Sequence, residues 1–255
     1  MYFIIFLVVA VFAGFYFYKN SKPKTVRSFP SEWENMLEEH VRFYRSLPKE
    51  KQPEFRARIL RFLSEVYIDG VDTEITDLDR LLIASSAVIP VFGFKEWHYY
   101  NLTGVLLYPD YFDDDLQFSN TDKERNIGGL VGSGRFERKM ILNRRALYIG
   151  FDNTTDKSNT GIHEFAHLID KMDGVTDGIP EQLLGHQYVI PWVNLMHKAM
   201  EEINDDKSDI RKYGGTSQAE FFAVVSEYFF ERPDLLEDKH PELFKMLYSC
   251  FNPKV

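Results

Sequence analysis

The sequence predicts an α+β fold, a mainly helical domain with a small sheet, preceded by an N-terminal transmembrane helix. Three observations support this prediction. The first eighteen residues carry no charged side chain, several segments between residues 33 and 82 place apolar residues at helical spacing, and short apolar runs bounded by Pro and Gly follow in the middle of the chain. With 44% hydrophobic and 15% aromatic residues, the 255-residue chain can build a substantial core.

Residues 1–18 predict a membrane anchor. At about 1.5 Å per residue a helix of this length spans roughly 27 Å, just short of a bilayer core of about 30 Å. A cleaved signal peptide, which would carry positive charge before the apolar run, and a soluble core helix are the alternatives. The positive charges follow the run instead, so we expect a single-pass inner-membrane protein with the rest of the chain in the cytoplasm. These charges belong to Lys19, Lys22, Lys24 and Arg27.

Residues 19–30 are predicted to form a short tether, and residues 31–255 one domain. Apolar residues at helical spacing predict three helices in the first part of this domain, within 33–44, 55–66 and 75–82. Short apolar runs predict strands at 88–94, 104–108, 140–142 and 146–151. The glycine-rich segment 113–139 lacks the Gly-Lys-Ser/Thr ending of a phosphate loop, which favours a plain loop or hairpin.

Charge and cysteine content exclude some classes of function. A formal net charge of -9 argues against nucleic-acid binding, because an acidic domain repels a phosphate backbone. The single cysteine, Cys250, rules out a disulfide-stapled scaffold. Its aromatic surroundings near the C-terminus favour a packed thiol over a catalytic one.

The segment 160–170 contains the candidate catalytic and metal-binding residues. It contains the pattern H-E-x-x-H, formed by His163, Glu164 and His167. Residues four apart lie on one face of a helix, so the two imidazoles can bind one Zn²⁺ at about 2.0–2.1 Å each. Glu164 is then placed to take a proton from the attacking water and pass it to the leaving amine. The sequence therefore predicts one catalytic zinc ion.

A catalytic zinc site needs a third protein ligand, and the residues leave the choice open. A third histidine six residues after His167 is excluded, because that position is Asp173. The apolar helix predicted over 217–231 carries two acids seven residues apart, on one face, and a buried acid needs a partner such as a metal. The candidates are Glu181, His186, His197, Glu220 and Glu227.

With these motifs the chain resembles the Mlc titration factor A (MtfA) peptidase family. The resemblance extends over about residues 45 to 250, with weaker matches at RLLIA (80–84) and Tyr108-Pro109. The specific motifs are HEFAHLID (163–170) followed by MDG (172–174) and DGIP (177–180), and YGGTSQAEFFAVVSEYFF (213–230).

The resemblance implies a zincin-like fold, similar to the catalytic domain of anthrax lethal factor, with a gluzincin-type site. It selects Glu220 as the third metal ligand, and Tyr213, seven residues earlier, as the residue that hydrogen-bonds the oxyanion. It also implies that Asp170 and Glu227 orient the imidazoles by hydrogen bonds. The activity it implies is that of an aminopeptidase on short peptides. The namesake binds the glucose repressor Mlc, an interaction that we do not carry over, so the regulatory protein partner is left unknown.

The sequence also allows two other hypotheses about the function. In the first, the chain is a membrane-tethered, non-catalytic zinc protein that binds a regulator such as a transcriptional repressor, with His186 or His197 closing the zinc site. In the second, the same zinc serves a hydrolase of another class. Intact Glu164 and Tyr213 favour the peptidase.

Overall fold

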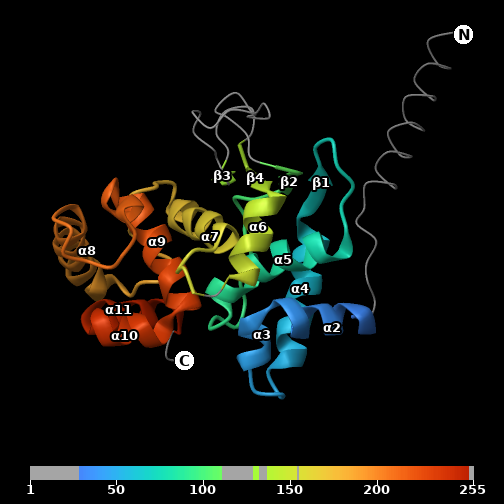
Figure 1. The fold of residues 1–255 in the computed structure, drawn as a ribbon, viewed down its shortest axis with the longest axis horizontal. Helices are drawn as coiled ribbons and strands as arrows, with labels where there is room; N and C mark the ends of the chain where they lie inside the picture. Colours follow the sequence, from blue (N-terminus) through green and yellow to red (C-terminus); the bar gives the residue numbers. More distant parts are fainter. Residues whose placement is uncertain (1–28, 111–128, 132–136, 154, 253–255) are drawn as a thin grey trace, which may run out of the picture.

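The computed structural model describes residues 29–110, 129–131, 137–153 and 155–252. Within these ranges the chain is mainly helical with a small, mostly parallel sheet, consistent with the expected zincin-like α+β domain. Figure 1 shows the sheet and helices α4 to α6 on one side of the molecule and helices α8 to α11 on the other, with α7 between them.

The sheet has four strands in the order β1-β2-β4-β3. Strand β2 pairs in parallel with β1 and β4, and β3 pairs antiparallel with β4, at one edge of the sheet. The central strands are almost continuously apolar because both of their faces are covered. The strands are β1 (Tyr67–Gly70), β2 (Gly104–Tyr108), β3 (Gly129–Val131) and β4 (Lys139–Asn143).

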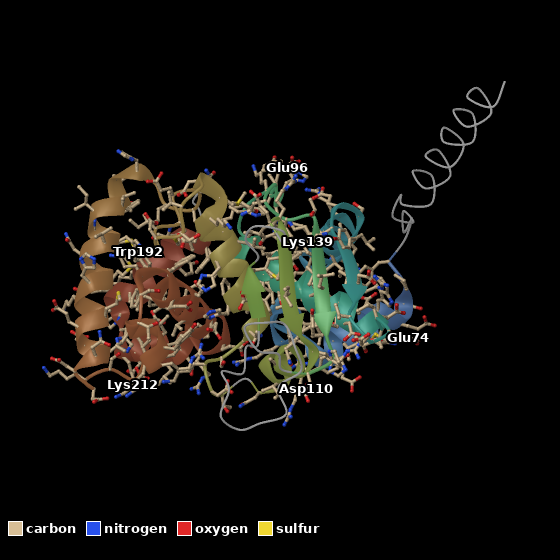
Figure 2. All side chains as sticks on the ribbon, turned by 90° about the horizontal axis from the view of Figure 1, so that it is seen from above. Glu74, Glu96, Asp110, Lys139, Trp192 and Lys212 are labelled. Atoms are coloured by element: carbon tan, nitrogen blue, oxygen red, sulfur yellow. The ribbon has the colours of Figure 1, made fainter. Side chains whose placement is uncertain are left out.

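Helices make up most of the described chain. In chain order they are α2 (Ser31–His40), α3 (Arg42–Ser46), α4 (Gln52–Glu65), α5 (Asp77–Val88), α6 (Arg144–Asp152), α7 (Thr160–Asp170), α8 (Val189–Asn204), α9 (Gln218–Glu231), α10 (Pro233–Lys239) and α11 (Pro241–Phe251). One hydrophobic core runs through both sides of the molecule. Figure 2 shows Trp192 among the helices on one side and Lys139 on the sheet at the other.

Helix α7 is the central element. It packs against α9 on one side and against α5, α6 and β3 on the other (Figure 1). The approach to α5 depends on Gly161, because a Cβ there would lie 2.1 Å from Oγ of Ser86. The asparagine side chain of residue 159 caps the helix by accepting a hydrogen bond from Ile162 N–H. The sequence motif on α7 is thus held between the two sides of the molecule.

Two predicted strands are wrong. Residues 88–94 form the end of α5 followed by a 3₁₀ turn at Ile89–Val91 (η1), and residues 146–151 lie within α6. A short, fully buried apolar run has no periodicity that separates strand from helix, which accounts for the first error. In α6 the buried residues recur with a helical period and Asn143 caps the helix. The predicted strands 104–108 and 140–142 are confirmed as β2 and β4.

Other boundaries also differ from the expectation. The predicted helix over 33–44 is two helices, because Val41 is extended between α2 and α3. Strand β1 is not among the predicted strands. Strand β3 falls within the segment 113–139, expected to be a loop or hairpin, and pairs antiparallel with β4. The predicted anchor at 1–18 and nearly all of the tether lie outside the described residues. In the part of the chain that is described, none of the helices has the length and apolar character to cross a bilayer.

Candidate metal centre

The H-E-x-x-H residues lie on α7, with His163 and Glu164 buried and His167 almost so. The two imidazole rings stand one helical turn apart, with their centroids separated by 4.8 Å. Their Nε2 atoms face each other at 3.2 Å. The other sides of α7 are apolar and join the core, so the helix is fixed while both imidazoles face the same point.

Helix α9 brings Glu220 to the same point. Ser217 caps this helix by accepting a hydrogen bond from Glu220 N–H, which places Glu220 in the first turn. Oε2 of Glu220 lies 3.1 Å from Nε2 of His163 and 3.5 Å from Nε2 of His167. The three side chains form the one cluster of potential metal ligands found in the described part of the chain.

The spacing of these three atoms suits a tetrahedral zinc ion. Bonds of about 2.0–2.1 Å from a tetrahedral centre put neighbouring ligand atoms about 3.3 Å apart. The three measured separations, 3.1, 3.2 and 3.5 Å, fall around this value. Oε2 of Glu220 is buried and accepts no hydrogen bond from the described residues. The donor set, two imidazole nitrogens and one carboxylate oxygen, is that of a catalytic zinc site with one open position.

Glu227 supports the cluster from behind. Its side chain is 1% exposed, and Oε1 lies 2.7 Å from Nδ1 of His163. An Nδ1–H donated to this carboxylate leaves Nε2 of His163 with the lone pair that a metal needs. Oε2 of Glu227 accepts a hydrogen bond of 2.6 Å from Asn159 N–H, and Oε1 also accepts one from Arg211. One carboxylate therefore joins the start of α7, a potential metal ligand on α7 and the loop before Tyr213.

The electrostatics of the centre favour a cation. Burial lowers the pKa of His163, but the carboxylates of Glu227 and Glu220 outweigh it and raise the pKa to about 10. Burial raises the pKa of Glu220, yet its contacts with the two imidazoles lower it overall. Three carboxylates, those of Glu164, Glu220 and Glu227, meet one guanidinium, that of Arg211. With both imidazoles neutral, as metal binding requires, these ionised groups leave an excess of two negative charges, which a divalent cation would balance.

Glu164 lies beside the three potential ligands without being one of them. Glu164 is buried, at 5% exposure, and burial raises the pKa of its carboxyl, while the charges of His163 and His167 lower it. Across from it stands Gly129, at the start of the edge strand β3. A Cβ on Gly129 would lie 2.5 Å from Cγ and 2.6 Å from Oε1 of Glu164. The bare backbone at this glycine leaves room for the Glu164 carboxyl.

Tyr213 lies next to the cluster on a 3₁₀ turn, η5 (Lys212–Gly215). Its ring stacks near that of His163, with centroids 6.0 Å apart and planes at 27°. The tyrosine is 45% exposed, so it stands at the solvent side of the centre. The loop before it is held by Arg211, through Glu227, and by Asp209.

Asp209 anchors that loop through three partners. Its carboxylate accepts hydrogen bonds from Lys157 at 2.7 Å, Tyr228 at 2.8 Å and His240 at 2.7 Å. Burial raises the pKa of Asp209, but these partners outweigh it and lower the pKa to about 2. The carboxylate is therefore ionised at neutral pH and ties the loop to α9 and to the loop before α7.

The other predicted residues stand apart from the cluster. His197 is exposed and pairs with the Gln218 side chain, while Glu181 and His186 are exposed and outside the group of potential ligands. Asp170 accepts a hydrogen bond from Gly178 N–H at 2.9 Å. No hydrogen bond joins Asp170 to an imidazole in the described residues, and Nδ1 of His167 is without a partner there.

Sequence reasoning did not find three residues of the centre, Asn159, Arg211 and Gly129. A signal existed for Asn159, because asparagine just before an apolar helix is a common cap. For Arg211 and Gly129 no local pattern was available, because both act through contacts with residues distant in sequence.

Comparison with known proteins shows what this chain is similar to. The sequence model of the family described as glucose-regulated metallo-peptidase M90 matches residues 17–252. A Synechocystis protein, described as uncharacterized, is 29% identical over 241 residues, covering 90% of this chain and 87% of that protein. Two proteins called Mlc titration factor A are similar as well. That of Pectobacterium atrosepticum is 31% identical over 69% of this chain and 68% of its own length, and that of Escherichia fergusonii 31% over 84% and 82%.

We predict that Glu227→Gln weakens zinc binding about 10- to 100-fold, because the amide cannot hold the Nδ1–H of His163 as a carboxylate does. Competition with a zinc-binding dye measures the affinity. Glu231→Gln is the matched control. Glu231 is a second buried acid on α9, which bonds the Asn159 side chain and makes no hydrogen bond to His163. Equal losses in the two variants would contradict a specific role for Glu227.

Proposed function

This chain belongs to the glucose-regulated metallo-peptidase M90 family, and from this membership and the centre on α7 and α9 we propose that it is a zinc-dependent enzyme that hydrolyses peptide bonds. One observation carries the proposal. His163, His167 and Glu220 converge at the spacing of a tetrahedral zinc site, and a fourth ionisable group, Glu164, is buried beside them without joining the ligand set.

Each residue of the centre has its own role in the proposed hydrolysis. Zinc, when bound, supplies Lewis acidity that polarises a carbonyl and lowers the pKa of water. The Glu164 carboxylate accepts the proton of the attacking water and then delivers it to the nitrogen of the leaving amine. The phenol of Tyr213 donates a hydrogen bond to the oxyanion that forms. Glu227 and Arg211 keep His163 and the Tyr213 turn in place.

The edge strand β3 offers a support for a peptide. Strand β3 pairs with β4 on one side, and Gly129 at its start lies against Glu164. An extended peptide can add to the free edge of a sheet through backbone hydrogen bonds, largely independent of its side chains. This arrangement would align a scissile bond with Glu164. For the substrate class we propose short peptides cleaved in the manner of an aminopeptidase, as the family resemblance implies.

A second candidate function is binding of a regulatory protein. The name of the relatives, Mlc titration factor A, links those proteins to a factor called Mlc. For this chain the corresponding proposal is a zinc-containing protein that binds a regulator without cutting it. A binding protein would not need the buried carboxyl of Glu164, so peptide hydrolysis is the better supported of the two.

We predict that Glu164→Gln keeps its zinc and loses about 10²- to 10⁴-fold in kcat/KM, because the amide cannot carry the proton. Tyr213→Phe should lose about 10²- to 10³-fold in kcat with little change in KM, because it removes an oxyanion donor. Metal analysis and fluorogenic short peptides measure both quantities. Zinc binding with no cleavage by the wild type, and no difference between it and the variants, would favour the binding protein.

We predict that Gly129→Ala lowers kcat while zinc content is unchanged, because the added methyl group would displace the Glu164 carboxyl. The same peptides and metal analysis apply. Gly185→Ala serves as the control. That glycine has a φ of -61°, which alanine accepts, and a Cβ there would come no closer than 3.3 Å to the Gln187 side chain. Full activity in Gly129→Ala would show that Glu164 does not need this space.

We also propose that residues 1–18 anchor the protein in the inner membrane with the catalytic domain in the cytoplasm. Their lack of charge and the four cationic residues that follow support this proposal. The full chain should sediment with membranes and resist carbonate extraction, and its domain should be protected from protease in spheroplasts. A chain of residues 20–255 should stay in the supernatant. Recovery of the full chain in the carbonate supernatant would overturn the anchor.

A further inference from the structure

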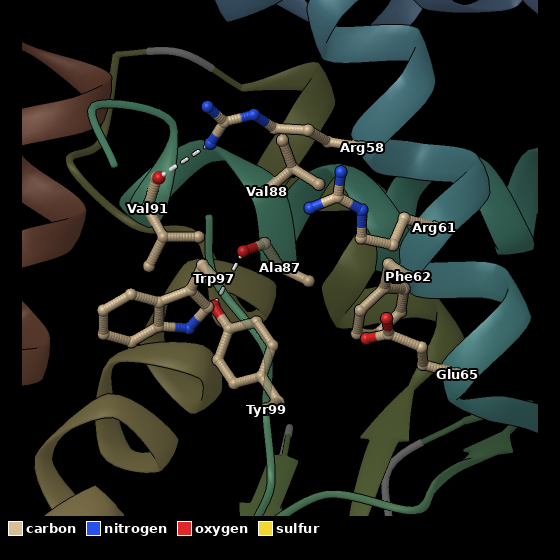
Figure 3. Close-up of a pocket in the computed structure, with 9 residues that line it drawn as sticks. All are labelled: Arg58, Arg61, Phe62, Glu65, Ala87, Val88, Val91, Trp97 and Tyr99. Atoms are coloured by element: carbon tan, nitrogen blue, oxygen red, sulfur yellow. Dashed lines mark hydrogen bonds between the residues drawn. The ribbon is translucent and has the colours of Figure 1, made fainter. Parts of the chain in front are cut away.

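Core packing fixes helix α7 from behind. Phe165, which follows Glu164, packs its ring edge-on against Phe62 and Tyr99, with ring centroids 5.7 and 5.2 Å apart. The Tyr99 hydroxyl donates to the Ala87 carbonyl at 2.7 Å, and Figure 3 shows this bond beside the Phe62 ring. The cavity among these residues measures about 30 Å³, which is room for water only. The imidazoles on α7 therefore take their positions from a rigid, packed helix.

Tyr213 is placed differently. It is 45% exposed and stands on the short turn η5, so the position of its phenol depends on the backbone that carries it. A group that stabilises a reaction's charge must be held within about 0.5 Å, and loops hold side chains less precisely than helices do. The loop that leads to Tyr213 must therefore be fixed by contacts of its own.

The pair of Lys157 and Asp209 fixes the start of that loop. Nζ of Lys157 donates to the Asp209 carboxylate at 2.7 Å and to the Asp209 backbone carbonyl at 2.8 Å. The ammonium also lies 4.6 Å from the centre of the Tyr228 ring, a cation–π contact. Because Lys157 bonds both the side chain and the main chain of one residue, it fixes the backbone at 209 and not only the carboxylate.

The backbone of Lys157 is itself strained. Its φ is 63°, in the left-handed region that residues with a Cβ rarely adopt. Such a conformation persists only where surrounding contacts hold it, and it is common near functional sites. Asp156, the preceding residue, accepts hydrogen bonds from the Asn153 side chain and from Ser158 N–H, which shapes this turn. The strained turn directs the Lys157 side chain toward Asp209.

A shift at Asp209 would be passed on to Tyr213. Between the two, Ile210 is 3% exposed and Arg211 bonds the buried carboxylate of Glu227. Just after Tyr213, a Cβ on Gly214 would lie 3.2 Å from Cγ1 of Val224 on α9. The segment 209–214 is thus packed along its length, and little of it can absorb a displacement at its start.

We propose that Lys157 and Asp209 are positioning residues, which hold the segment 209–213 so that the Tyr213 phenol stands at the metal centre. The inference rests on the proposed peptidase function, in which Tyr213 donates to the oxyanion. Neither residue of the pair contacts the three potential metal ligands. Loss of the pair should therefore act on the reaction through Tyr213 and leave zinc binding intact.

A double-mutant cycle on the full chain in detergent micelles tests this, with fluorogenic short peptides as substrates. Asp209→Asn should lower kcat about 10- to 100-fold, the effect of a small misplacement, with KM and zinc content nearly unchanged. In the Tyr213→Phe background the same change should have little further effect, because the hydrogen bond that it positions is already absent. Lys157→Gln should behave in the same way.

A second Lys–Asp pair supplies the matched control. Lys207 and Asp205 lie 2.8 Å apart but are 69% and 61% exposed, whereas Lys157 and Asp209 are 17% and 26% exposed. Lys207→Gln and Asp205→Asn should leave kcat unchanged. A general structural defect would lower kcat by the same factor with Tyr213 and with Phe at that position. Equal factors in the two backgrounds would overturn the positioning role.

A readout independent of turnover uses 3-fluorotyrosine incorporated at position 213 alone and followed by ¹⁹F NMR. Asp209→Asn and Lys157→Gln should shift or broaden this signal, and Asp205→Asn should not. An unchanged signal in the folded Asp209 and Lys157 variants, with folding checked by thermal melting, would overturn the proposal. A signal that moves in a wild-type chain that cleaves no peptide would support the positioning of Tyr213 and overturn the peptidase function instead.

Discussion

The buried carboxylate of Glu227 is the constraint on which the centre depends. It is 1% exposed, and burying a carboxylate is costly unless donors replace the lost water. Three donors do so, and each comes from a different place: the first residue before α7, the imidazole of His163, and Arg211 in the loop before η5. Glu227 therefore fixes the relative positions of α7, α9 and the turn that carries Tyr213. Separating any of them would leave a buried charge without its partners.

The same constraint explains why the sequence could not choose between Glu220 and Glu227. Seven residues apart on one helix, both acids face α7, so spacing makes them equivalent. The structure distinguishes them by the nitrogen that each one meets. Glu220, in the first turn of α9, reaches Nε2 of His163, whereas Glu227, two turns later, reaches Nδ1 of the same ring. Which acid meets which nitrogen depends on the position of α9 along the axis of α7. No sequence pattern within one helix contains that information.

Much of the fold could be predicted from local patterns, and the failures share a cause. Helix α7 and helix α9 have long apolar faces and clear caps, so their periodicity indicates them well. The errors fall on short apolar runs, at 88–94 and 146–151, where a few buried residues fit a strand as well as a helix. Gly129 is harder still, because the need for a bare backbone there arises from Glu164, 35 residues later in the chain. The histidine pair is local and was predictable, whereas the space around Glu164 is tertiary.

The distinction between a structural and a catalytic metal site turns on Glu164. A structural site is closed by its ligands and has no use for another acid beside it. Here a carboxyl is held against the potential ligands, buried to 5% exposure, with burial raising its pKa. Such burial costs folding stability, and it makes the group a better proton acceptor near neutral pH. Tyr213, half exposed at the open side of the same cluster, adds a donor where a substrate oxygen would arrive. A buried acid beside three converging potential ligands is costly for a scaffold and useful for a reaction. For this reason the geometry favours hydrolysis over metal storage or structural support.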